Sequence, residues 1–282
     1  MNTTPLKIDL QAIIKSRLPQ NKSKFIPTFL IKMLEKLVCQ EELNGILNRT
    51  FPHEGVAFAD AALSDLNITV DVVGLENIPS TGRFIFASNH PLGGLDGIAL
   101  IKVIGGIYGD ENFRFLVNDM LMKVRPLRNV FLPINKYGAQ GRSAAVQINQ
   151  VYESDRQMII FPAGLVSRKQ KGGEIKDLQW QKAFIVKAIE YQRDIIPVFF
   201  EGFNSLFFYN FAKWRKCSGL KFNIEQVLLP SEVCKSKGKH FRIHIGKPIS
   251  WQSLVESKKT PMQLAADVKE IVYNINSCPE NK

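Results

Sequence analysis

The sequence contains few cysteines, few histidines and no long apolar run. Its cysteines are scattered, with neither a C-x-x-C pair nor a histidine at zinc-finger spacing; they are Cys39, Cys217, Cys234 and Cys278. This pattern is typical of reduced thiols in a cytosolic protein and argues against a metal site built from cysteine. The most apolar stretch, residues 195–214, contains Glu201, Asn204 and Asn210. It therefore falls short of the about 18 uninterrupted apolar residues that a membrane-spanning helix needs.

The amino-terminal stretch MNTTPLKIDLQAIIKSRLPQ also lacks the features of a secretory signal. Its only apolar segment is short, and Lys15 and Arg17 interrupt it. We therefore expect a soluble or peripheral protein in the cytoplasm, which would meet a membrane at its inner face.

The chain is strongly basic. Its 37 lysines and arginines outnumber 26 acidic residues, which gives a net charge of +11. Nucleic acid, an anionic membrane surface and a polyanionic substrate all fit this excess, and charge alone does not choose among them. A simple contribution to solubility fits equally. Hydrophobic residues make up 45% of the 282 residues, so the chain can bury a sizeable core.

Residues 1–65 are predicted to form an amino-terminal helical segment. Apolar residues recur at helical spacing, at Phe25, Leu30, Ile31, Leu34, Leu37, Val38, Leu43, Ile46 and Leu47. Lysines stand among them at positions 22, 24, 32 and 36. A basic amphipathic helix of this kind can lie in a membrane interface, and it can equally pack against the main domain.

Residues 66–282 alternate between strand-like and helical patterns. Strands are predicted at residues 68–73, 84–87, 113–117, 130–134, 158–161, 195–200 and 241–245, and helices at 98–103, 143–152 and 178–191. A last helix should begin at the capping box Thr260-Pro261-Met262-Gln263. This alternation predicts an α/β fold with a central mixed, largely parallel sheet flanked by helices. Ligand sites in such folds lie beyond the carboxyl ends of the strands.

The segment FIFASNHPLGGLDGIALI places a histidine and an aspartate in such a position. His90 follows a predicted strand, Gly93 and Gly94 permit a sharp turn, and Asp96 falls where the next helix begins. Each residue has a simpler interpretation, since an aspartate at a helix start is a common N-cap and a histidine near a strand end is often only a hydrogen-bonded polar group. The chain has only four histidines, and the combination favours a site.

A histidine paired with a carboxylate is suited to general-base chemistry. The imidazole can deprotonate a substrate hydroxyl, while a carboxylate on its other nitrogen fixes the tautomer and stabilises the imidazolium. No nucleophilic serine is required if the substrate supplies the hydroxyl.

The motif SNHPLGGLDG resembles the first motif of the glycerolipid acyltransferase superfamily, and the preceding VVGLENIPSTGRFIFA resembles its lead-in. The resemblance implies that His90 is the base, that Asp96 orients it and that Asn89 borders the substrate. The spacer between His90 and Asp96 has five residues, whereas four are usual in the family. The form H-P-x-G-x-x-D-G is similar to a branch that acylates unusual bacterial lipids, including amino-acid lipids.

Three later segments also resemble motifs of that superfamily. PLRNVFLPINKYG is similar to the second motif, and Lys136 then stands where a basic residue contacts the acceptor. IIFPAGLVSRKQKGG is similar to the third motif. The match comprises Phe161, Pro162, Gly164 and Ser167, and Ala163 replaces the motif's glutamate. Val166 occupies the position of the motif's arginine, and Arg168 follows that position. Ile196-Pro197-Val198 resembles the fourth. Both Lys136 and Arg168 are also explained as solvated surface charges.

The resemblance implies an acyltransferase that needs no metal or bound cofactor. An acyl thioester, carried on coenzyme A or on acyl carrier protein, would donate to a lipid hydroxyl, with Lys136 and Arg168 holding an anionic head group. Backbone N–H groups of the Gly93–Gly94 loop are candidates to stabilise the oxyanion. The expected partners are an anionic membrane surface, the lipid acceptor and an acidic acyl carrier protein.

Three other functions fit parts of the sequence. A nucleic-acid-binding protein fits the pI near 9.5, but the lysines are dispersed and no known nucleic-acid motif is present, so we do not expect nucleic acid as a partner. A lipid-binding protein without turnover fits Ala163. Metal-dependent hydrolysis would use His90 and Asp96 as ligands, but the sequence offers no clear further ligands.

Overall fold

A computed structural model describes residues 4–11, 27–134, 142–170, 172–217 and 224–275 of the chain. Its centre is a seven-stranded sheet with the strand order β1-β9-β8-β2-β5-β3-β4. The strands are β1 (Thr69–Val73), β2 (Phe84–Ser88), β3 (Phe113–Asn118), β4 (Phe131–Ile134), β5 (Gln157–Ile160), β8 (Asp194–Glu201) and β9 (His240–Ile245). The expected α/β class is confirmed.

Five neighbouring strands of this sheet run in the same direction. β2 pairs in parallel with β8 and β5, and β3 pairs in parallel with β5 and β4. β9 and β1 pair in parallel with each other, and β9 joins β8 antiparallel. The sheet is therefore mixed and largely parallel, as predicted. The carboxyl ends of β8, β2, β5, β3 and β4 meet at one edge, where the loop after β2 begins.

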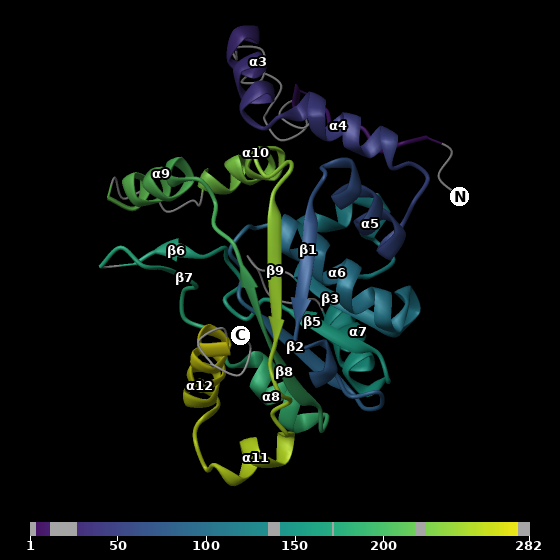
Figure 1. Cartoon of the computed structure of the whole chain (residues 1–282), viewed down its shortest axis with the longest axis vertical. Coiled ribbons are helices and arrows are strands. Elements are labelled where there is room, and N and C mark those ends of the chain that lie inside the picture. Colours follow the sequence, from purple (N-terminus) through teal and green to yellow (C-terminus); the bar gives the residue numbers. More distant parts are fainter. Residues whose placement is uncertain (1–3, 12–26, 135–141, 171, 218–223, 276–282) are drawn as a thin grey trace.

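Helices lie on both faces of the sheet and beyond one of its ends (Figure 1). They are α3 (Thr28–Leu37), α4 (Gln40–Arg49), α5 (Gly55–Asp65), α6 (Leu95–Tyr108), α7 (Arg142–Glu153), α8 (Ala183–Glu190), α9 (Leu206–Cys217), α10 (Leu229–Cys234), α11 (Trp251–Glu256) and α12 (Pro261–Asn274). A short hairpin, β6 (Arg168–Lys169) with β7 (Ile175–Lys176), and the 3₁₀ turn η5 (Ile224–Leu228) complete the parts used below.

Strand β2 contributes to the core on both of its sides. Phe84 and Phe86 belong to the core cluster that includes α5 and α6, whereas Ile85 and Ala87 belong to the cluster that includes α8 and α12. This division follows from the alternation of side chains along a strand. Because both faces are covered, the strand is a continuous apolar run, and all five of its residues are buried.

Residues 28–65 of the amino-terminal segment form mainly helices, as expected, whereas residues 4–9 are not helical. α3 contacts α4, α4 contacts α5 and α10, and α5 packs against α6. On α3, Ile31 is buried, but Phe29, Met33 and Leu37 are exposed. The predicted apolar residue Phe25 and Lys22 and Lys24 lie outside the described residues.

Several element boundaries differ from the sequence prediction. The helix expected at 178–191 begins only at Ala183, because the preceding residues form a bonded loop in which Gln181 donates its backbone N–H to Pro162. The strand expected at 158–161 ends at Ile160. The capping box at Thr260 and Gln263 is confirmed by reciprocal hydrogen bonds. Within the described ranges, no helix combines the length and the apolar character needed to cross a bilayer.

Candidate active site

His90 and Asp96 are in direct contact beyond the carboxyl end of β2. The Nδ1 atom of His90 lies 2.9 Å from Oδ2 of Asp96. The two residues come from successive pieces of chain, since His90 follows β2 and Asp96 lies in the first turn of α6. The tight loop between them folds the chain back so that the side chains meet.

Asp96 is completely buried and accepts four hydrogen bonds. Its Oδ2 accepts from His90 and from the backbone N–H groups of Leu92 and Gly93, at 2.9 and 3.3 Å, and its Oδ1 accepts from the N–H of Gly97 at 2.9 Å. Gly94, rather than Asp96, is the N-cap of α6, so the N-cap interpretation of Asp96 is wrong. The carboxylate instead organises the loop and faces the imidazole.

Two opposing effects set the pKa of Asp96. Burial alone raises the pKa of a carboxyl group, because it disfavours the charged form. The charge and hydrogen bond of His90, together with the backbone N–H groups of Leu92 and Gly97, outweigh burial, so the pKa of Asp96 is lowered. The side chain is therefore a carboxylate at neutral pH and can stabilise a protonated His90.

The imidazole of His90 is held flat against the ring of Phe161. Their centroids are 3.8 Å apart with an interplanar angle of 19°, and Phe161 in turn meets Phe115 edge-on at 5.2 Å. The side chain of His90 retains 14% of its surface exposed, and its Nε2 makes no hydrogen bond to any described residue. The ring is thus fixed through Nδ1 and its face, while part of the side chain remains exposed.

The environment of the carboxylate distinguishes this pair from the other histidine–carboxylate pairs of the described chain. His244 pairs with Glu201 and His240 pairs with Asp71, at 2.7 and 3.0 Å. In those pairs the acid side chains are 39% and 57% exposed, whereas Asp96 is 0% exposed. A carboxylate shielded from water acts more strongly on its imidazole than one in solvent.

The backbone of His90 is fixed by Ser167 and Asp177. The N–H of His90 donates to Oδ1 of Asp177 at 3.2 Å, and its carbonyl accepts from the N–H of Ser167 at 2.8 Å. The Ser167 hydroxyl donates to the same Asp177 oxygen at 2.5 Å. Ser167 therefore supports His90 from behind through backbone contacts and a shared carboxylate.

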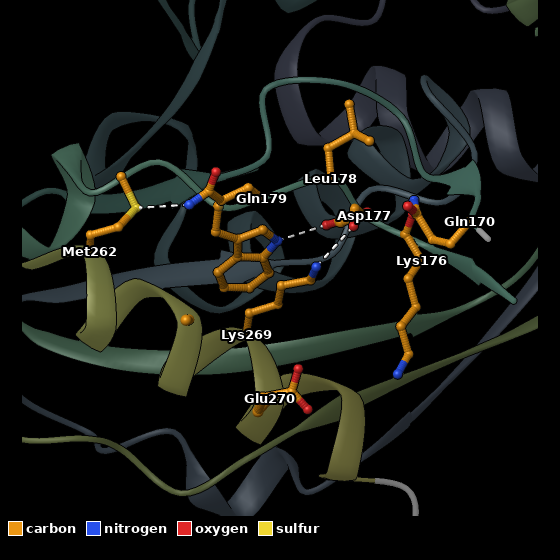
Figure 2. A pocket seen from close by; sticks show the side chains of 10 residues that line it. Gln170, Lys176, Asp177, Leu178, Gln179, Met262, Lys269 and Glu270 are labelled. Atoms are coloured by element: carbon orange, nitrogen blue, oxygen red, sulfur yellow. Dashed lines mark hydrogen bonds between the residues drawn. The ribbon is translucent and has the colours of Figure 1, made fainter. Parts of the chain in front are cut away.

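Asp177 is itself held by residues from distant parts of the chain. Its Oδ2 accepts from the indole of Trp180 at 2.9 Å, and its backbone N–H donates to the Tyr273 hydroxyl at 2.7 Å. Burial raises the pKa of Asp177, opposed by its hydrogen bonds to Ser167 and Trp180. Lys269 of α12 donates to the carbonyl of Asp177 at 2.9 Å, a contact that Figure 2 shows.

Two asparagines fix the loop from the side of β8. Asn89 is buried, and its amide group both donates to the carbonyl of Phe200 and accepts from its N–H, at 3.0 and 2.7 Å. Asn204 donates to the carbonyl of Pro91 at 3.1 Å. The backbone of Phe200 therefore binds both the nitrogen and the oxygen of the Asn89 side-chain amide. These bonds fix the chain directly before His90.

Glycine is required at position 93 for two reasons. Gly93 has a φ of +87°, which disfavours other residues, and an added Cβ would lie 2.7 Å from a side-chain atom of Leu229 and 2.9 Å from one of Val166. The N–H of Gly93 is directed at Asp96, but the N–H of Gly94 has no hydrogen-bond partner among the described residues. Of the two glycines, Gly94 is the one with a donor available for an oxyanion.

The guanidinium of Arg168 is paired with a buried acid. It donates to the fully buried Glu225 at 2.8 Å, and Arg215 of α9 lies 2.7 Å from the other oxygen of that carboxylate. Arg168 is therefore ion-paired and not simply a solvated surface charge, and the three side chains together carry one net positive charge; the binding of a head group by Arg168 stays a prediction. Lys136, the other expected cation, lies outside the described residues.

The remaining motif residues shape the wall behind Phe161. Pro162 and Ala163 are buried, and Ala163 packs within the apolar cluster on the α8 side of the sheet. Gly164 is exposed and has a φ of +62°, which allows the turn between β5 and Ser167. The position of the usual glutamate is thus occupied by an apolar contact.

A cavity of about 350 Å³ lies against Asp177 (Figure 2). Polar and charged side chains from the 170–179 loop and α12 line it, among them Gln170, Lys176, Lys269 and Glu270. Asp177 lines this cavity and also accepts a hydrogen bond from the backbone of His90, so it connects the cavity to the His90 loop. Across the described residues, no three histidine, cysteine or acidic side chains are grouped to hold a metal ion.

Comparison with known proteins is in keeping with this geometry. A buried carboxylate behind an accessible imidazole, at the carboxyl ends of parallel strands, suits hydroxyl acylation. The chain belongs to the Acyltransferase family, whose sequence model matches residues 13–277, and it is an enzyme of that class. The resemblance seen in the sequence motifs is confirmed.

Two relatives match almost the whole chain. The lyso-glycine lipid O-acyltransferase of Phocaeicola vulgatus is 46% identical over 268 residues, which is 95% of each protein. The lyso-glycine lipid O-acyltransferase of Bacteroides thetaiotaomicron is also 46% identical over 268 residues, covering 95% of this chain and 97% of the relative. Among solved structures, the 1-acyl-sn-glycerophosphate acyltransferase PlsC of Thermotoga maritima aligns with a TM-score of 0.48 at 16% identity, covering 95% of this chain and 86% of that one.

Proposed function

We propose that the chain transfers a fatty acyl group from an acyl thioester to the hydroxyl of a lyso-glycine lipid. The proposal for the acceptor rests on the two relatives of that name, each 46% identical across 95% of this chain. The single structural observation that carries the chemistry is the His90–Asp96 pair, with the imidazole partly exposed and the carboxylate buried. Coenzyme A and acyl carrier protein are the two candidate carriers of the thioester.

His90 and Asp96 divide the reaction between them. The acceptor oxygen attacks the thioester carbonyl carbon as Nε2 of His90 takes its proton, and Asp96 stabilises the resulting imidazolium. As the tetrahedral intermediate collapses, the carbon–sulfur bond breaks and the imidazolium returns the proton to the leaving thiolate. The new carbon–oxygen bond is the ester of the product.

Backbone and loop residues supply the remaining functions. The N–H of Gly94, at the start of α6, is proposed to stabilise the oxyanion, helped by the positive end of the helix. Lys136 is proposed to meet the acceptor carboxylate. Arg168, paired with Glu225, remains a second candidate for that contact.

The substrate also implies contact with an anionic membrane surface at the cytoplasmic side. α3 supports this part of the proposal, because exposed Phe29, Met33 and Leu37 recur along one helical face beside Lys32 and Lys36. Its apolar residues recur every four positions, which places them on one side of the helix.

Purified full-length protein tests the proposed chemistry directly. Acyl-coenzyme A and acyl carrier protein donors are offered with lyso-glycine lipid or lysophosphatidic acid, and the diacylated product is measured by mass spectrometry. His90→Ala should lower turnover by about 10²–10⁴-fold, the usual share of general-base catalysis. The matched control is His240→Ala, which removes an exposed histidine paired with Asp71 and should retain activity.

Two outcomes would contradict the proposal at different levels. Wild-type turnover in His90→Ala would refute the mechanism. Transfer to lysophosphatidic acid but not to lyso-glycine lipid would leave the mechanism standing and refute the acceptor. Lipid analysis of cells lacking the gene should show the lyso-glycine lipid accumulating.

A further inference from the structure

Helix α9 presents a continuous apolar face to solvent. Four large side chains on it and on the turn before it are mostly exposed: Phe203 at 61%, Leu206 at 69%, Phe207 at 55% and Trp214 at 59%. Phe207, Phe211 and Trp214 form a ladder of stacked rings, with centroids 6.1 and 5.8 Å apart. Their spacing places them on one side of the helix. Contiguous exposed apolar patches of this kind mark interaction surfaces.

The charged residues of α9 itself are all basic. The helix contains Lys213, Arg215 and Lys216 and no acidic residue, and Arg215 is paired with the buried Glu225. Lys235, which follows α10, is exposed, pairs with Glu232 at 2.7 Å and lies with its ammonium 5.8 Å from the centroid of the Phe207 ring. Aromatic residues combined with lysine and arginine suit the boundary between lipid head groups and acyl chains, where a tryptophan ring is particularly stable.

The opposite side of α9 is firmly attached to the body of the protein. Phe208, Tyr209 and Ala212 are buried, and Phe208 and Tyr209 join Val166 and Leu228 in a small core cluster. The buried Glu225 links Arg215 of this helix to Arg168 of the β6 strand. The buried side of α9 therefore anchors the helix to the rest of the protein, while its apolar face stays exposed.

Direct contacts connect this helix to the catalytic loop. Asn204, in the turn before α9, donates its side-chain amide to the carbonyl of Pro91 and its backbone N–H to the Tyr209 hydroxyl. Pro91 follows His90 directly. A surface that contacts α9 thus lies close to the site where the acceptor must arrive.

We propose that the α9 face, defined by Phe203, Leu206, Phe207, Phe211 and Trp214, docks on an anionic lipid bilayer and inserts its rings at the head-group boundary. This inference rests on the proposed function only in that a lipid acceptor would enter from that surface. The 12-residue helix is too short to span a bilayer, so it lies in the interface. In Figure 1, α9, α10 and α3 occupy the same end of the molecule.

Trp214 is a built-in reporter for this docking. Of the three tryptophans, Trp180 is buried and Trp251 is partly buried on α11. Adding vesicles of phosphatidylcholine and phosphatidylglycerol to the full-length protein should shift the emission to shorter wavelength, and brominated acyl chains should quench it. Trp214→Phe should abolish the shift while keeping an aromatic ring, and Trp251→Phe should leave the shift unchanged.

Vesicle co-sedimentation then measures the contribution of each ring. Phe207→Ser and Trp214→Ser should each weaken binding by about tenfold, because each removes one large apolar side chain from the interface. Val255→Ser, which changes an exposed apolar residue on α11, is the matched control and should bind as the wild type. Circular dichroism checks that each variant is folded.

The results separate docking from chemistry. Unchanged binding of both serine variants, or a shift that persists in Trp214→Phe, would overturn the inference. So would a loss of binding in Phe29→Ser alone, which would place the contact on α3, or a Trp214 response to acyl carrier protein and not to vesicles. None of these binding measurements needs turnover, so they test docking even if the proposed acyl transfer fails.

Discussion

The substitution Asp96→Asn tests the catalytic pair most sharply. In the wild type, Oδ2 accepts from the His90 ring and from two backbone N–H groups, and Oδ1 accepts from the N–H of Gly97. An asparagine has only one oxygen, so its NH₂ group must face a donor in either orientation. If it faces His90, the ring must adopt the tautomer protonated at Nε2, which cannot serve as a base.

The expected loss follows from these contacts. If the amide oxygen instead takes the place of Oδ2, the tautomer survives but the imidazolium loses its counter-charge. In both orientations we expect turnover to fall by about 10²–10⁴-fold with little change in KM, because binding groups are untouched. The unsatisfied donor should also lower the free energy of unfolding by about 1–3 kcal/mol.

Acid dependence gives an independent measurement on the same variant. The folded-state pKa of Asp96 is lowered, so its charge contributes stability above the unfolded-state pKa of about 3.9. That contribution is lost as the pH falls through the folded-state value. Urea denaturation should therefore show the wild type losing its advantage over Asp96→Asn below about pH 4.

Steady-state assay of Asp96→Asn against Asp71→Asn completes the test. Asp71 is the exposed partner of His240, so its substitution should leave turnover unchanged. Wild-type turnover in a folded Asp96→Asn variant would show that the buried carboxylate does not act on the imidazole, and the reasoning would be refuted.

Two further substitutions examine the supports of the site. Phe161→Ala removes the ring stacked 3.8 Å from His90 and should lower kcat about three- to tenfold, the value of an aromatic pair; an unchanged kcat in a steady-state assay would contradict this. Glu225→Gln leaves Arg168 and Arg215 buried without their shared counter-charge and should cost about 3–5 kcal/mol in urea denaturation. A loss as small as that of a surface ion pair would show that solvent reaches the two guanidinium groups.

The contact between His90 and Asp96 could be predicted because the two residues are close in the sequence. His90 and Asp96 are joined by a short glycine-containing loop between an apolar strand and a helix, and all of these features have local patterns. The mixed, largely parallel sheet was predicted from the alternation of elements, whereas its strand order was not. Packing on both faces then explains why β2 is apolar throughout.

The supports of the pair could not be predicted, because they arise from distant contacts. Asp177 reaches the backbone of His90 across 87 positions and is held by Tyr273 across a further 96. The pairing of Arg168 with Glu225 likewise spans 57 positions. An arginine in a basic loop looks the same in the sequence whether solvent or a buried acid neutralises it.

The helix α9, with its exposed apolar face, could not be predicted for a different reason. Residues 195–214 form one apolar stretch in the sequence, but the structure divides it into all of β8 except Asp194, a turn and most of α9. Short apolar runs fit a buried strand and an amphipathic helix equally well, so the boundary between the two is not readable from hydrophobicity alone.

The position of β2 in the sheet has a consequence for how such an enzyme can diversify. β2 is hydrogen-bonded on both sides, to β8 and β5, and His90, the proposed base, follows its carboxyl end. The β6–β7 hairpin lies outside that sheet, and β4 lies at its edge. Substitutions in the peripheral loops can therefore change which head group is accepted without moving His90 and Asp96. The acceptor selectivity of such an enzyme can then evolve separately from its chemistry.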